Sequence, residues 1–275
     1  MDDKKIVITG ANGQVGRALQ KVYPQALALD REQLDITNQK AINEFNWDNV
    51  KVIINAAAWT DVDGAENPSN YGLVKAVNVD ATRYLATAAS QHDLTFVTFS
   101  SDYVFDGSQP IHNEDETFSP LNIYGKTKAD GDLAAATTIK HYIIRTSWVI
   151  GDGRNFVNIM QDLAARGVKP SVVNDQIGRL TFTDTLARGI KHLLEIGAPY
   201  GTYNLTNEGQ PVSWADIAKI VFEKSGKSPS DVQPVSTAEY FADKPNTAKR
   251  PLQSTLDLTK IEKTGFIPED WRDKL

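Results

Sequence analysis

The stretch "IVITGANGQVGRAL", residues 6–19, limits the folds open to this chain more than any other. A short apolar run ends at Thr9, glycines follow, and a helical pattern then begins. In such a turn one glycine ends the strand, another lets the backbone approach a phosphate, and a third lets the helix pack on the strand. The free N–H groups of the helix start suit an anion. We predict a dinucleotide-binding turn made of Gly10, Asn12, Gly13, Gln14, Val15 and Gly16.

The glycine spacing is G-x-x-G-x-x-G and not the more usual G-x-G-x-x-G, so a plain turn between a strand and a helix is the alternative. The surrounding pattern favours the nucleotide site. Unbroken apolar runs, typical of buried parallel strands, alternate with helical segments through the first half of the chain. The runs lie at 5–9, 26–30, 52–57, 94–101 and 141–147, and the helical segments near 14–22, 38–45, 70–91 and 124–138.

This alternation predicts an α/β fold with a Rossmann-type, doubly wound parallel sheet. We expect residues 1–149 to form the dinucleotide-binding domain and residues 150–275 to form mainly a smaller substrate-binding domain, with segment 177–199 as a candidate to return to the first. The second half carries helical patterns near 155–167 and 183–196. A further helix begins at Ser213, with Asp216 placed to close a capping box and Gly226 past its end. The tail from residue 228 is rich in Pro, Ser and Thr and is predicted to be loop-like.

Composition excludes several classes of function. The chain of 275 residues has no cysteine, which rules out disulfides and Cys-ligated zinc, and its four histidines stand far apart. We predict no metal site. A net charge of −6 with scattered basic residues argues against nucleic-acid binding. No apolar stretch approaches the length of a membrane span, and the N-terminus does not resemble a signal peptide, so a cytoplasmic protein without a membrane partner is expected.

Candidate cofactor residues follow the second apolar run. Asp30 ends that run about twenty residues after the glycines, where a carboxylate accepts the ribose hydroxyls of NAD and repels a 2′-phosphate. Arg31 comes next and can pair with such a phosphate, so the choice between NADH and NADPH stays open. Asp35 and Ile36 are candidates for the adenine pocket, and an ordinary loop is the alternative.

Tyr124 and Lys128 lie four residues apart on a predicted helix, which alone is weak evidence because such neighbours are common. Other motifs add to it: "TGANGQVG", "NAAAWTDVDGAE", "SSDYVFDG", "PLNIYGKTK", "RTSWV" and "KRPLQS". With these motifs the chain resembles the extended short-chain dehydrogenase/reductase family over residues 6 to about 271. Within it the resemblance is to the branch that uses NADH or NADPH to reduce the 4-keto group of a dTDP-linked 6-deoxy sugar, giving dTDP-L-rhamnose.

The resemblance implies roles for individual residues. Tyr124 would give a proton to the ketone oxygen, with its pKa lowered by the nearby ammonium of Lys128. Lys128 would also bind the nicotinamide ribose. Ser101 would orient and polarise the carbonyl, with Ser100 as the competing choice. The remaining implied cofactor contacts are Ala56, Ala57, Ala58, Asn78 and Ser100, and the implied substrate contacts are Ser101, Asp102, Tyr103, Trp148, Asn155 and Arg250.

Three positions depart from the pattern of that branch, namely Ile150, Asn158 and Leu180.

Two alternatives to this function remain open. The regulatory subunit of methionine adenosyltransferase has a closely similar "SSDYVFDG" and "YGKTK" region and acts as a binding partner, not as a reductase. Another nucleotide-sugar reductase or epimerase of the same family would act on a different sugar. The chain is expected to be a monomer or a homodimer.

Overall fold

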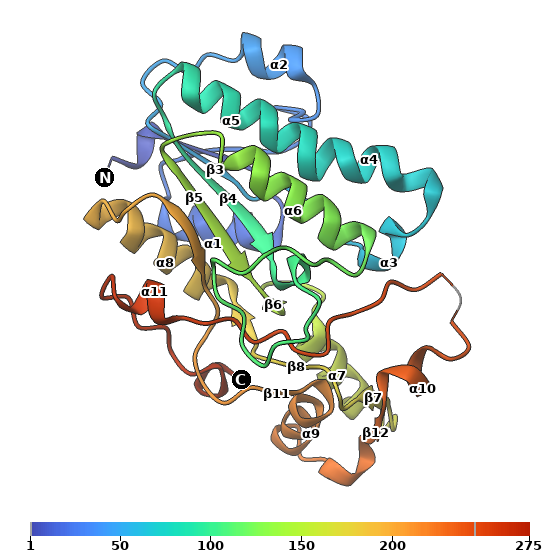
Figure 1. The fold of residues 1–275 in the computed structure, drawn as a ribbon. Helices are drawn as coiled ribbons and strands as arrows, with labels where there is room; N and C mark the ends of the chain where they lie inside the picture. The colour runs from blue at the N-terminus through green and yellow to red at the C-terminus, as the bar shows by residue number, and fades with distance from the viewer. Residues whose placement is uncertain (1, 245) are drawn as a thin grey trace.

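A six-stranded parallel sheet forms the centre of the molecule, in a computed structural model that describes residues 2–244 and 246–275 (Figure 1). The strand order is β10-β5-β4-β3-β1-β2. All five apolar runs predicted as strands are confirmed. The strands are β1 (Ile6–Thr9), β2 (Leu27–Leu29), β3 (Val52–Asn55), β4 (Thr95–Ser101), β5 (His141–Thr146) and β10 (Gly201–Asn204).

The sheet is buried on both faces, which explains why its strands are apolar without alternation. In β1, Ile6 and Ile8 point into one apolar cluster and Val7 into the other. Helices α1 (Gln14–Val22) and α8 (Thr183–Ile196) complete the first cluster. Helices α2 (Gln39–Glu44), α5 (Ala81–Gln91) and α6 (Ile123–Ala135) cover the opposite face (Figure 1). The predicted doubly wound α/β fold is therefore confirmed.

The helical segment expected near 70–91 contains a change of helix type. It comprises α4 (Tyr71–Lys75), a π-helical turn at Ala76–Asp80 and then α5. Such π turns are rare and occur often beside functional sites. Here the turn buries Asn78 against α6, and it is preceded by the short helix α3 (Val62–Ala65).

A second layer lies beyond the carboxyl ends of the sheet strands, where α7 (Phe156–Ala165) packs on α9 (Trp214–Lys224) around a separate apolar cluster (Figure 1). The predicted capping box is present, because Ser213 and Asp216 bond each other's backbone N–H. Gly226 has a φ of 71°, as expected just past a helix end. Short strands pair as β11 (Val212–Ser213) with β8 (Ile177–Gly178), β12 (Gln233–Val235) with β7 (Ser171–Val173), and β6 (Val149–Ile150) with β9 (Thr181–Phe182).

The prediction of a loop-like tail from residue 228 is wrong in part. The tail contains β12, α10 (Thr237–Phe241) and α11 (Thr259–Glu262), and β12 pairs with β7 through backbone bonds that its short, Pro-containing sequence does not reveal. α8 lies against α1, and β10 extends the central sheet beside β5. The domain boundaries given above stay predictions.

The order of the strands reverses at β1. This strand lies between β2 and β3, so the chain adds β2 on one side of β1 and then adds β3 on its other side. In open α/β sheets ligands bind at such a reversal, outside the carboxyl ends of the strands. The glycine turn after β1 and the three alanines after β3 both lie at this edge.

Candidate active site

The glycine turn has the geometry of an anion-binding turn. Gly10 has a φ of 73°, and a Cβ there would lie 2.5 Å from the backbone nitrogen of Ala57. A Cβ on Gly16 would lie 2.2 Å from the carbonyl oxygen of Gly10, so only glycine lets α1 sit this close to β1. Gly13 caps α1 without a side-chain bond to the helix start. Backbone N–H groups are therefore left to meet a ligand at this end of α1.

A cleft of about 340 Å³ opens in front of this turn. Of the predicted cofactor residues, those that line the cleft are Gly10, Asn12, Gly13, Asp30, Arg31, Asp35, Ile36, Ala56, Ala57 and Ala58. Leu34, Thr37 and Val77 also line it and were not predicted. Leu34 and Val77 carry no chemical signal in the sequence, because apolar residues at these positions read as core. The Thr37 hydroxyl donates to Asp35 at 2.6 Å, and this hydrogen bond is the largest cause of the lowered pKa of Asp35.

Asp30 is held firmly at the edge of the cleft. Its Oδ1 accepts from the backbone N–H groups of Glu32 and Gln33, at 3.0 and 3.1 Å, and its Oδ2 accepts from the Asn12 amide at 3.1 Å. Arg31 is largely exposed and lies 3.8 Å from Asp35. A fixed carboxylate therefore faces the cleft, beside an exposed arginine that pairs with Asp35.

Other predicted cofactor residues lie behind the cleft or beside it. Gln14, Val15 and Gly16 belong to the first turn of α1, and Val15 packs on the core cluster. The Asn78 amide accepts from the backbone N–H of Trp59 at 2.9 Å and donates to Thr127 at 3.1 Å. Asn78 thus ties the loop after β3 to α6, and its contact with a cofactor stays a prediction.

Close packing of α6 brings Tyr124 to the end of β4. Asn122 caps α6 by accepting from the N–H of Gly125 at 2.7 Å. A Cβ on Gly125 would lie 2.1 Å from the carbonyl oxygen of Tyr103, so this glycine lets α6 approach the 3-10 turn Asp102–Val104. The Tyr103 and Tyr124 rings meet edge to face, with centroids 5.6 Å apart.

Lys128 is buried beneath Tyr124. Its Nζ donates to the carbonyl oxygen of Phe99 at 2.6 Å, and burial lowers its pKa to about 8, against the opposing effect of Asp132. The expected lowering of the Tyr124 pKa is wrong for this structure. Burial raises it, while the nearby Ser101 hydroxyl lowers it to a smaller extent. A phenol with a raised pKa stays protonated at neutral pH, which suits a proton donor.

Ser101 and Ser100 differ in their surroundings. The Ser101 Oγ donates to Asp102 Oδ1 at 2.9 Å and accepts from the Tyr103 N–H at 3.1 Å. The Ser100 Oγ is buried, makes no hydrogen bond of normal geometry within residues 2–244 and 246–275, and faces the Asp132 carboxyl. Ser101 is the hydroxyl that lies close to Tyr124.

Arg250 reaches this site from the far end of the chain. Its Nη2 donates to Asp63 Oδ2 at 2.7 Å, and its guanidinium lies over the Phe241 ring, 4.6 Å from the centroid. Burial raises the pKa of Tyr103, and the charge of Asp102 raises it further. The charge of the nearby Arg250 lowers the Tyr103 pKa to a smaller extent. The structure thus brings together Ser101, Tyr103, Tyr124 and Arg250.

Trp148 and Asn155 have other neighbours. The Trp148 indole stacks on Trp214 with centroids 3.8 Å apart, so one of its faces is covered by protein and not open to a sugar. Asn155 caps α7, accepts from the N–H of Asn158 and donates to the Gly151 carbonyl at 2.7 Å. Both stay predictions as substrate contacts.

No group of three or more potential metal-ligating side chains is arranged to hold an ion in the described part of the chain. The carboxylate of Asp184, an acidic residue in the first turn of α8, accepts a hydrogen bond from Lys274 at 2.6 Å. None of the helices formed by the described residues combines the length and the apolar character needed to cross a bilayer.

The fold and the site define a short-chain dehydrogenase/reductase of the extended type. They combine a Rossmann-type sheet, a glycine turn at the reversal point of that sheet, and a Tyr–Lys pair beside a strand-end serine. The comparisons narrow this class. The chain belongs to the family described as the RmlD substrate binding domain, whose model matches residues 4–275.

Individual relatives agree with this assignment. The chain is 40% identical over 289 residues to a dTDP-4-dehydrorhamnose reductase of Aggregatibacter actinomycetemcomitans, covering 98% of this chain and 97% of that one. A crystal structure of a dTDP-4-dehydrorhamnose reductase from Clostridium acetobutylicum matches with a TM-score of 0.89 at 38% identity, covering 98% and 95%. The corresponding protein of Bacillus anthracis, in complex with NADP, matches with a TM-score of 0.89 at 34% identity, covering 98% and 95%.

Proposed function

We propose that this chain reduces the 4-keto group of dTDP-4-dehydro-L-rhamnose to give dTDP-L-rhamnose, with NADH or NADPH as the reductant. The observation that carries the proposal is the meeting of Ser101, Tyr124 and Lys128 at the end of β4, in a chain that matches reductases of this name over nearly its full length. The names of these relatives favour the reductase over a binding subunit of an adenosyltransferase.

The cleft suits a nicotinamide dinucleotide. The uncapped start of α1 fits a pyrophosphate, Asp30 fits a ribose, and the small side chains of Ala56 and Ala57 leave room beside the backbone. The bound nicotinamide supplies a hydride to the carbonyl carbon. The relative from Bacillus anthracis was solved with NADP, which supports a cofactor of this class.

The protein supplies the proton and the alignment. Tyr124, protonated at neutral pH, donates its hydroxyl proton to the carbonyl oxygen as that oxygen gains charge. Ser101 donates a hydrogen bond to the same oxygen and stabilises the developing charge. Lys128, held by the Phe99 carbonyl, places a positive charge beneath the phenolate that Tyr124 becomes.

The test of this function is nicotinamide oxidation by the purified chain with dTDP-4-dehydro-L-rhamnose, compared with other nucleotide-linked keto-sugars. We expect the dTDP-linked substrate to be preferred. Preference for another keto-sugar would indicate a different reductase of the family. Binding of an adenosyltransferase subunit, with no turnover of any keto-sugar, would indicate the regulatory alternative.

Arg250 is proposed to bind the diphosphate of the sugar nucleotide. Asp63 and the Ala248 carbonyl accept from its Nη2 and Nη1, and Phe241 lies against it, so the guanidinium is held in one direction. A planar group with several N–H donors in fixed positions suits phosphate contacts. Arg250→Ala should raise KM for the sugar nucleotide about tenfold to a hundredfold, as expected for loss of a charge-assisted hydrogen bond. The Kd for NADH should hardly change, and dTDP alone should compete with the sugar nucleotide but not with NADH.

Lys249 provides a matched control for that variant. It is the adjacent basic residue and its side chain is exposed. Lys249→Ala removes the same net charge, so it should leave KM within about twofold of the parent. Equal effects of the two substitutions would show that Arg250 acts only through the general field of the protein.

Asp30 is proposed to favour NADH over NADPH. Asp30→Ala removes the charge that would face a 2′-phosphate, and the exposed Arg31, 3.8 Å from Asp35, would then pair with that phosphate. The ratio of the two dissociation constants should shift toward NADPH by about tenfold, or about 1.4 kcal/mol. Asp30→Asn retains an oxygen for the N–H groups of Glu32 and Gln33 and should shift the ratio in the same direction. An unchanged ratio in both variants would place Asp30 away from the ribose.

The state of assembly, monomer or homodimer, and the cytoplasmic location both stay predictions. Sedimentation of the purified chain at several concentrations separates the two states of assembly, because a dimer dissociates on dilution.

A further inference from the structure

Asp102 is a buried carboxyl that the proposed reaction does not yet use. Its side chain is 2% exposed. Oδ1 accepts from the Ser101 hydroxyl at 2.9 Å, while Oδ2 is buried, makes no hydrogen bond of normal geometry within the part of the chain that the structure describes, and the carboxyl also faces the Ser254 hydroxyl. The substrate contact that the resemblance implies for Asp102 stays a prediction.

The bond between Ser101 and Asp102 conflicts with the role of Ser101. A hydroxyl has one proton, and the Ser101 proton is directed to the carboxylate. The Ser101 Oγ also accepts from the Tyr103 N–H, which fixes the side chain in place. With Asp102 ionised, Ser101 has no proton to give to a keto oxygen. With Asp102 neutral, the carboxyl O–H can donate to Oγ, and the Ser101 proton becomes free.

We propose, on the basis of the reductase function above, that Asp102 is a positioning residue: neutral Asp102 frees the Ser101 hydroxyl to bind the keto oxygen, and ionised Asp102 holds it away. No bond to the substrate is needed for this effect. The reaction is fast while the carboxyl is neutral and slows as it ionises.

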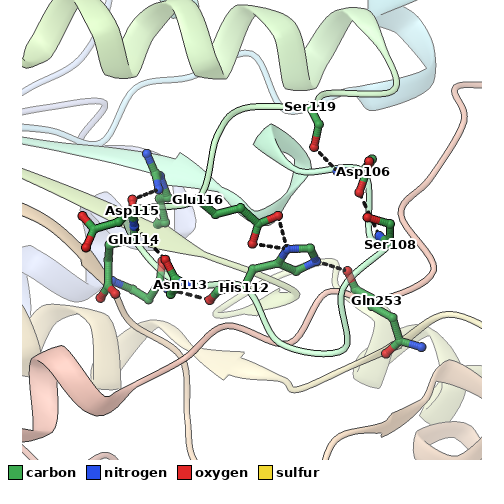
Figure 2. Close-up of polar contacts among 11 residues, drawn as sticks. Asp106, Ser108, His112, Asn113, Glu114, Asp115, Glu116, Ser119 and Gln253 are labelled. Atoms are coloured by element: carbon green, nitrogen blue, oxygen red, sulfur yellow. Dashed lines mark hydrogen bonds and ion pairs between the residues drawn. The ribbon is translucent and has the colours of Figure 1, made fainter.

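The groups around Asp102 permit this change of charge near neutral pH. Burial raises the pKa of Asp102 to about 6, against the lowering effects of the Ser254 and Ser101 hydroxyls and of His112. His112 makes no hydrogen bond to Asp102, because its ring nitrogens face the Glu116 carboxylate at 2.9 Å and the Gln253 carbonyl at 3.2 Å (Figure 2).

Two further titratable neighbours of Asp102 are tyrosines. Tyr103 follows it in the same turn and Tyr124 faces it from α6, and the charge of Asp102 raises the pKa of both. Burial already raises both values, so these phenols stay neutral while Asp102 titrates. Asp102 is thus the group at this point whose charge changes near pH 6, whereas Lys128, on α6, changes its charge near pH 8.

The experiment compares the pH dependence of kcat for the parent, Asp102→Asn and a control, Asp106→Asn. Since the neutral form is competent, kcat of the parent should fall at least about tenfold from about pH 6 to about pH 8. The amide that Asp102→Asn introduces donates to the Ser101 Oγ at every pH, so this variant should lose no more than the roughly twofold expected by pH 8 from Lys128, whose pKa is about 8. Asp106 lies in the same motif, accepts from the Ser108 N–H at 2.8 Å (Figure 2), and should keep the parental profile when replaced by Asn.

A second measurement needs no substrate. Infrared difference spectra of the parent minus Asp102→Asn report the carboxyl of Asp102 directly as pH changes. Ser101→Ala removes a hydrogen bond to the ionised form and should raise the pKa of Asp102 by about one unit. An unmoved titration in Ser101→Ala would overturn the proposal.

Two kinetic results would also overturn it: an Asp102→Asn variant that keeps the falling limb, or a folded Asp102→Asn variant that binds NADH and has no activity at any pH. Failure of the reductase function has a different signature. The parent would then turn over no dTDP-linked keto-sugar, while the infrared titration would still show whether Ser101 and Asp102 are linked.

Discussion

Tyr124→Phe is expected to lower kcat by about 10²- to 10⁴-fold while the Kd for NADH stays at the parental value. The substitution removes only the hydroxyl that donates the proton. The ring keeps its edge-to-face contact with Tyr103, and α6 keeps its Asn122 cap, so the fold should not change. Steady-state kinetics, a cofactor titration and a thermal unfolding curve measure the three quantities.

Tyr71→Phe is the matched control, because Tyr71 is an exposed tyrosine of α4. It should have parental kinetics. If Tyr124→Phe also turned over substrate at the parental rate, another group would have to be the proton donor and the site would need a new assignment.

Gly10→Ala is expected to have the second large effect, on cofactor binding. At a φ of 73° a side chain is strained, and the new Cβ would lie 2.5 Å from the Ala57 nitrogen in the wall of the cleft. The loop after β3 must then move away, which reshapes the pyrophosphate site. We expect the Kd for NADH to rise at least about tenfold, with a loss of about 1–3 kcal/mol of folding free energy from the strained backbone.

Gly72→Ala tests whether any glycine substitution has this effect. Gly72 lies in α4, and a Cβ there would meet no atom within 4 Å. Alanine in a helix is more favourable than glycine by roughly 0.5–1 kcal/mol, so this variant should be slightly more stable and bind NADH normally. Normal NADH binding by Gly10→Ala would refute the placement of the cofactor at this turn.

The sheet could be predicted from local sequence because its strands are buried on both faces and so are unbroken apolar runs. β10 could not, since Gly201–Asn204 is short and largely polar. It joins the sheet through pairing with β5, and the side-chain amide of its buried Asn204 donates to the His112 carbonyl at 3.0 Å. Such a partner, 92 residues away, leaves no trace in the local pattern.

The candidate site likewise has parts that the local sequence predicts and parts that depend on tertiary contacts. Motifs that act within one turn or one helix, such as Gly10 to Gly16 and Tyr124 with Lys128, were visible in the sequence. The direction in which the Tyr124 pKa shifts was not visible in the sequence, because burial outweighs the effects of the neighbouring groups and depends on the whole fold. The pairing of Arg250 with Asp63, and the stacking of Trp148 on Trp214, also depend on tertiary contacts.

The joining of Asp63 to Arg250 across 187 residues has a consequence for biosynthesis. Chains emerge from the ribosome N-terminus first, at about 5–20 residues per second, and early segments fold before late ones exist. The cleft that we propose for the dinucleotide is lined by residues between 10 and 77, whereas the proposed sugar-nucleotide site lacks its arginine until residue 250 has been made. Because α8, which packs on α1 behind the cleft, ends at Ile196, a nascent chain would complete the support of its reductant site only after that residue, and still before Arg250 of its proposed substrate site is made.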